Sequence, residues 1–107
     1  MAGFNEREKA FESKFKHDEE LRFKANARRN KLLGLWAAEK MGLGEAEASA
    51  YAIEVVKSDF VKAGDDDVLH KVLTDLQARG VDTSEHLVRK HMDALMETAI
   101  AQVSSEA

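Results

Sequence analysis

The sequence predicts an all-α protein: an irregular four-helix bundle with a flexible, partly helical N-terminal arm. Its 107 residues include no proline and only six glycines. Ala, Leu, Glu and Lys, which lose little side-chain freedom in a helix, are abundant. Aromatic and β-branched residues are scattered, and no run of them is typical of a strand. A chain of this length suffices for one domain with one core.

The first predicted helix begins near residue 5 or 6 and ends near Met41, because Gly42 is a favourable left-handed residue after a helix. Beyond His17 this helix carries an apolar stripe, interrupted by Arg28, that we expect to pack on the other helices. The stripe consists of Leu21, Ala25, Leu32 and Trp36, and Leu33 and Leu35 broaden it.

The rest of the chain divides into three further helices, two of which end at Gly64 and Gly80. The expected ranges are 45–63, from 65–67 to about 79, and from about 82–85 to about 103. The aspartates at 65–67 can cap free backbone N–H groups and suit the positive end of the helix dipole. Asp82 and Glu85 have the spacing of a capping box, with Asp in the place of Ser or Thr.

Each of these three helices has apolar residues at steps of three and four, which keep side chains on one face. The stripes are Ala46, Ala50, Ile53, Val56 and Phe60; then Leu69, Val72, Leu73 and Leu76; then Leu87, Val88, His91, Leu95 and Ala99. Short connections favour antiparallel packing. We interpret His91 as a hydrogen-bonded core imidazole, because no histidine lies four residues from another, as a helical zinc site would require.

Before His17 the only large apolar residues are Phe4, Phe11 and Phe15, set among many charges. At about 100° per residue, these rings fall within about 40° of one another and form a narrow ridge. An unbroken helix over 5–41 would be about 55 Å long, whereas the later helices span about 20–32 Å each. We therefore expect residues 1–19 to form a partner-binding arm beside a bundle of residues 20–107. The alternative is that the rings fold back onto the core.

The net charge of −4 is unevenly distributed along the chain. Residues 1–31 hold nine Lys/Arg and six Asp/Glu (+3), and residues 32–107 hold seven and fourteen (−7). Residues 22–31 include five basic residues and no acid. This segment is interpreted as a solvated face paired with acidic neighbours, as a site for a small anionic ligand, or as a nucleic-acid contact. The acidic remainder disfavours nucleic acid. The expected acidic neighbours are Glu45, Glu47 and Glu97.

No enzyme signature occurs: there is no phosphate-binding loop, nucleophile elbow, HExxH pair or cysteine. The aspartates at 65–67 do not begin a calcium loop, since its sixth and twelfth positions hold His70 and Leu76 instead of Gly and Glu. We predict no metal site. No stretch approaches the roughly 18 apolar residues of a membrane span, and the N-terminus is unlike a secretory signal. A cytoplasmic protein is expected.

A long block carries a specific signature: DEELRFKA at 18–25, followed by ARRNKLLGLWAA at 27–38. Phenylalanines and charged residues precede it, and further matches follow it. These are Phe4, Arg7, Glu8, Phe11, Glu12 and Phe15, then Tyr51, Ala52, Val55, Val56, Asp59 and the turn at 64–68. Over nearly the whole chain, the sequence resembles the zeta subunit of alphaproteobacterial rotary ATP synthases.

This resemblance implies a four-helix bundle that inhibits ATP hydrolysis by the catalytic sector of the synthase and is not itself an enzyme. It assigns inhibition to the N-terminal segment, which becomes helical at a catalytic α/β interface beside the rotating central stalk. The inhibitory residues carried over are Phe4, Arg7, Glu8, Phe11, Glu12 and Phe15. The implied partners are the alpha, beta and gamma subunits at the cytoplasmic face of the membrane-bound enzyme, with no nucleic acid and no membrane insertion.

The resemblance also implies that ADP or ATP binds the bundle as a regulatory ligand, with no cofactor required. No short motif defines that site. Because the basic segment lacks acids, we predict phosphate contacts from Arg22, Lys24, Arg28 and Arg29, with Trp36 as a stacking surface. The alternative function is a nucleic-acid-binding or assembly module that uses residues 22–31.

Overall fold

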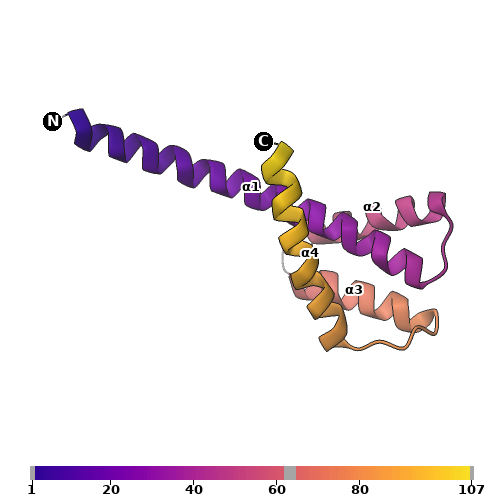
Figure 1. The fold of residues 1–107 in the computed structure, drawn as a ribbon. Coiled ribbons are helices and arrows are strands. Elements are labelled where there is room, and N and C mark those ends of the chain that lie inside the picture. The colour runs from indigo at the N-terminus through magenta and orange to yellow at the C-terminus, as the bar shows by residue number, and fades with distance from the viewer. Residues whose placement is uncertain (1, 62–64, 107) are drawn as a thin grey trace.

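The computed structural model describes the backbone of residues 2–61 and 65–106, and the side chains of residues 19–59 and 65–106. Over this part of the chain it confirms the all-α prediction. The four helices are α1 (Ala2–Lys40), α2 (Glu45–Val61), α3 (Asp65–Ala78) and α4 (Glu85–Glu106) (Figure 1).

Helix α1 is by far the longest element, with 39 residues against 17, 14 and 22 in the others. Its C-terminal part packs against α2, α3 and α4, whereas its N-terminal part projects away from them (Figure 1). The projection gives the molecule extents of 65 × 25 × 23 Å. The helix is continuous through the body and the projecting part. The division into an arm of residues 1–19 and a bundle of residues 20–107 stays a prediction.

The predicted helix ends at Gly42 and Gly80 are confirmed. Both glycines are left-handed, with φ of 76° and 77°. After α1, the amide of Leu43 donates to the carbonyl of Ala38 at 2.9 Å, and the residues after α3 repeat this pattern. Such a motif satisfies carbonyl groups left free at a helix end. The N-cap of α4 is Ser84, whose Oγ accepts from the amide of Leu87 at 3.3 Å, so the predicted capping box at 82–85 is wrong.

The core lies where α1, α2, α3 and α4 meet. Its buried members are Leu33, Ala37, Ala38, Tyr51, Val55, Val68, Leu69, Val72, Leu76, Val88 and Met92. The predicted stripe of α3 is confirmed, with Leu73 at its edge. Gly34 allows α1 to approach α2 closely, since a Cβ there would lie 2.6 Å from the Cα of Ala52.

The predicted buried face of α2 is wrong. Ile53 is 54% exposed, and the buried residues are Tyr51, Ala52 and Val55. Ala46 and Ala50 are also exposed, and the side chain of Phe60 lies outside the described residues. Apolar residues occur at helical spacing on two faces of α2, so periodicity alone does not choose between them. The close contact at Gly34 selects the face that carries Ala52 and Val55.

In α4 the predicted stripe is partly right. Val88 and Ala99 are buried, but Leu87 is 45% exposed and Met92 fills the core instead. His91 is not a core imidazole: it is exposed and stacks on Trp36 of α1, with ring centroids 4.2 Å apart. The polar ring stays at the edge of the interface, where water can still reach its nitrogens.

Tyr51 ties α2 to α3. Its hydroxyl donates to Oδ2 of Asp75 at 2.8 Å, and Nζ of Lys71 lies 3.1 Å from the same oxygen. Burial raises the pKa of the Tyr51 hydroxyl well above its usual value of 10.0, and the hydrogen bond to Asp75 raises that pKa further. The hydroxyl is therefore neutral in the folded protein.

We expect Tyr51→Phe to lower the free energy of unfolding by about 1 kcal/mol at pH 8, the usual net value of one hydrogen bond. In the wild type, the unfolded chain loses the Tyr51 proton above about pH 10 while the folded protein keeps it, so stability falls as pH rises further. The advantage of the wild type should thus shrink above that pH. Urea titrations of both proteins from pH 8 to 11 check this, and a constant difference would contradict it.

Candidate functional site

The basic segment 22–31 lies in the middle of α1, where the helix runs between α2 and α4. Its two adjacent arginines, Arg28 and Arg29, face different helices, because successive residues are about 100° apart around a helix. Arg28 reaches α4: its Nη1 donates to Oε1 of Gln102 and its Nη2 to Glu106, both at 2.8 Å. These contacts hold the C-terminal end of α4 against α1.

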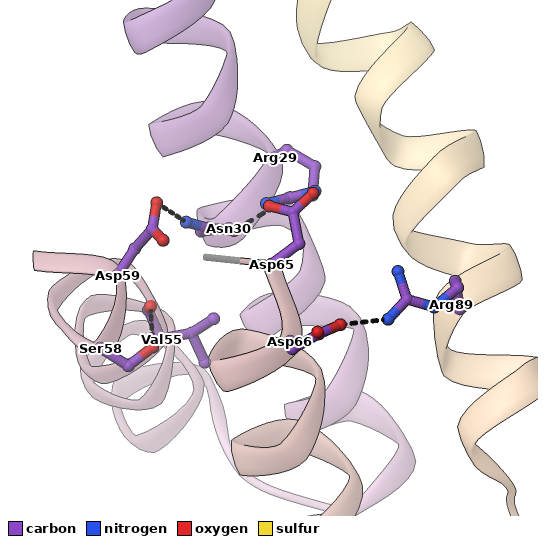
Figure 2. A network of polar contacts seen from close by, with 8 residues as sticks. All are labelled: Arg29, Asn30, Val55, Ser58, Asp59, Asp65, Asp66 and Arg89. Carbon is purple, nitrogen blue, oxygen red and sulfur yellow. Dashed lines mark hydrogen bonds and ion pairs between the residues drawn. The ribbon is translucent and has the colours of Figure 1, made fainter. Parts of the chain in front are cut away.

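Arg29 belongs to a polar network that joins α1 to both sides of the α2–α3 connection (Figure 2). Its Nη2 donates to Oδ1 of Asp65 at 2.8 Å, and its Nε donates to Oδ1 of Asn30 at 2.9 Å. The amide nitrogen of Asn30 donates in turn to Asp59 at 3.3 Å. Arg29 is 2% exposed and Asn30 is fully buried. Their burial is tolerated because each has polar partners.

The aspartates at 65–67 occupy the first turn of α3, at the positive end of its dipole. Their capping of backbone N–H groups stays a prediction. Two of them also bind arginines of other helices: Asp65 pairs with Arg29, and Asp66 with Nη2 of Arg89 on α4 at 2.6 Å (Figure 2). Within the part of the chain that the structure describes, no group of three or more His, Asp or Glu side chains is arranged to hold a metal.

The structure separates the predicted nucleotide-binding residues. Lys24 and Arg28 line one groove, beside α2 and the end of α4, and Arg22 lines another, between α1 and α4. Arg29 is buried in the network, and Trp36 is stacked on His91. Nucleotide binding by these five residues stays a prediction.

The acidic partners of the two arginines are Asp65 and Glu106. The acidic residues predicted from the sequence, Glu45, Glu47 and Glu97, form no ion pair with either arginine. Pairing of the basic segment with acidic groups is therefore correct for Arg28 and Arg29, but through different residues.

The predicted inhibitory residues lie on the projecting part of α1. They are Phe4, Arg7, Glu8, Phe11, Glu12 and Phe15, and their side chains lie outside the described residues. Their role in partner binding stays a prediction.

Sequence reasoning missed the Asn30–Asp59 contact and a groove between α1 and α2. The groove is lined by Lys31, Leu35, Ser49, Ala52, Ile53, Val56 and Lys57. Ile53 and Val56 have the helical spacing of a core stripe, so the periodicity of α2 predicts that they are buried. The position of Asn30 was a signal for a buried polar contact, because this polar residue lies beside the apolar positions of α1.

In the described part of the chain, no helix has the length and apolar character of a membrane span.

Known proteins resemble this chain in sequence and in fold. A sequence model of the family described as ATPase inhibitor subunit zeta matches residues 1–102. A structure determined by NMR in solution shares 50% sequence identity with this chain and superposes on it with a TM-score of 0.70. The alignment covers 81% of this chain and 99% of the other. No curated protein matches the chain.

Proposed function

Because the chain belongs to the ATPase inhibitor subunit zeta family, we propose that it blocks ATP hydrolysis by inserting its N-terminal helix into the catalytic sector of the ATP synthase. The family consists of regulatory proteins that are not enzymes, and membership implies inhibition of the ATP synthase. The family match over residues 1–102 carries this proposal, since it includes the projecting part of α1 as well as the bundle.

The length of α1 supports an inserting role. At 1.5 Å per residue, its 39 residues span about 58 Å. The 14 residues of α3 and 22 of α4 span only about 21 and 33 Å. A body of that size leaves the start of α1 free to enter a groove on another protein.

In the proposed mechanism the bundle is a docking body, and the arm is a wedge that folds on entering the groove and stops rotation in the hydrolytic direction. Burial of Phe4, Phe11 and Phe15 in the partner would stabilise the complex by about 1.5–3 kcal/mol per fully covered ring. Arg7 and Glu8 would set the register by charge pairing, and Glu12 would add to it. The groove would be formed by the alpha, beta and gamma subunits, at the cytoplasmic face of the membrane-bound enzyme.

The contacts of Arg28 and Arg29 suit this mechanism. They join α1 to α4 and to the start of α3, on the bundle side of the proposed arm. Because α1 is continuous, a load on the arm passes along the helix into the bundle. The anchored bundle would keep the arm from turning with the central stalk.

A regulatory ADP or ATP is part of the same proposal. The exposed Lys24 could bind a phosphate group beside the partly exposed Arg28, because both residues line the same groove. Titration with ADP while amide shifts are recorded tests this. Shifts at residues 22–31 would support the assignment, and shifts confined to α2 and α3 would show that it is wrong.

The function is tested by measuring ATP hydrolysis by the isolated catalytic sector as full-length protein is added. We expect a saturable loss of turnover. An assembly factor would instead bind without changing turnover, and a nucleic-acid module would be retained on DNA or RNA in a salt-sensitive way. Undiminished turnover at saturating protein would exclude inhibition.

A further inference from the structure

Two adjoining hollows lie on one side of α1 beside α2. The larger one, about 750 Å³, has Ser49 and Ala52 among its lining residues, with Leu35 and Ile53. The second, about 500 Å³, lies along α1 and extends to Val103 and Glu106 at the end of α4. The two parts share Lys31 and Val56. We call this surface the α1/α2 groove; its further members in the second part include Phe23, Lys24 and Ala27.

The groove carries exposed apolar side chains. Among the described residues, the large hydrophobic side chains that are exposed are Phe23, Ile53, Leu87 and Ile100. Phe23 is 61% exposed and Ile53 54%, and both line the groove. Ser49 and Ala52, which line the same hollow as Ile53, are small and leave room for side chains of a partner. A concave apolar surface of this kind is a candidate protein interaction site.

Positive charge surrounds this apolar surface. Lys24, Lys31 and Lys57 line the groove and are exposed, and its acidic lining residue, Glu106, is paired with Arg28. None of the three lysines forms an ion pair with a described residue, whereas Arg28, Arg29, Lys71 and Arg89 do. The lysines remain unneutralised in a protein whose net charge is −4.

We propose that the α1/α2 groove binds an acidic amphipathic helix on the catalytic sector of the ATP synthase. The apolar ridge of that helix would fill the space beside Ile53 and Leu35, and its carboxylates would meet Lys24, Lys31 and Lys57. The inference rests on the proposed function. It gives the complex a second contact, in addition to the inserted N-terminal arm. The concave shape favours a helix ridge over a flat lipid surface.

The position of the groove explains how docking helps inhibition. One wall of the groove is α1, the same helix that carries the arm. A partner held there fixes the direction of the arm. Two linked contacts also bind more tightly than either one, because the second association is intramolecular.

The test compares full-length variants by their Kd for the isolated catalytic sector at low salt. The double variant Lys31→Glu/Lys57→Glu reverses the charge of the groove, and Ile53→Asp disrupts its apolar surface. Matched controls are Lys40→Glu/Lys90→Glu, also exposed lysines, and Ile100→Asp, whose side chain is 51% exposed on α4. The helical circular-dichroism signal confirms that each variant is folded.

Both groove variants should bind about tenfold more weakly or worse, and the controls should stay within about threefold of wild type. Raised salt should narrow the difference for the lysine variant but not for Ile53→Asp. Groove variants that bind like wild type would overturn the proposal.

Other occupants give different results. The proposal is also overturned if the lysine variant leaves the Kd unchanged but abolishes binding to vesicles of phosphatidylcholine and phosphatidylserine, or dissociates a self-dimer in sedimentation. Failure of the proposed function is separate: wild-type protein would then bind with groove-dependent Kd but leave ATP turnover unchanged. Wild-type protein that does not bind the catalytic sector at all would refute both.

Discussion

Replacement of Arg29 by methionine should lower the free energy of unfolding by about 2–3 kcal/mol. The main cost arises at Asn30, which is fully buried and would lose the donor to its Oδ1. The lost ion pair with Asp65 adds less, because that carboxylate is 57% exposed and can be solvated. Methionine fills much of the same volume, so the loss reports the polar network and not a cavity.

Arg28→Met is the matched control. Arg28 is the neighbouring residue on the same helix, but its side chain and that of Glu106 are 28% and 56% exposed. Water can replace these contacts, and the expected loss is below about 1 kcal/mol. Urea unfolding followed by circular dichroism measures both variants. Equal small losses would show that the Arg29 network does not stabilise the fold.

Gly34→Ala should lower the free energy of unfolding by about 1–3 kcal/mol. At an open helical position the same change would stabilise the protein by about 1 kcal/mol, since alanine is the better helix former. Here the new Cβ would lie 2.6 Å from the Cα of Ala52 and 3.2 Å from a methyl of Val55. A backbone atom cannot rotate aside, so α1 and α2 must move apart.

The control for this variant is Gly44→Ala. Gly44 precedes α2, and a Cβ there would meet no other atom within 4 Å. Its expected effect is below about 1 kcal/mol. Thermal unfolding of the two variants tests the difference. A Gly34→Ala protein as stable as wild type would contradict the close packing of α1 on α2.

Local signals predicted the helices well. Gly42 and Gly80 mark helix ends through their own backbone preference, and α3 has a single apolar stripe that needs no further information. The face of α2 could not be predicted in this way, because Ile53 and Val55 both lie on plausible stripes. The choice depends on Gly34, a residue of another helix.

The polar contacts were less predictable for the same reason. Arg29 meets Asp65, a residue 36 positions away, and Arg28 meets Glu106, 78 positions away. Nothing near Arg29 in the sequence distinguishes it from Arg28, although only Arg29 is buried. Its basic character instead suggested a ligand site. The groove beside α2 is not predicted, because the helical spacing of Ile53 is also typical of a core residue.

The most direct test of the arm is ATP hydrolysis by the isolated catalytic sector with full-length protein or with protein that lacks residues 1–18. The shortened protein should keep the melting behaviour of the bundle, because the contacts of Arg28, Arg29 and the core remain. It should lose inhibition at concentrations where the full-length protein stops turnover. Inhibition of equal strength by the shortened protein would contradict the role of the N-terminal helix as the inhibitory element.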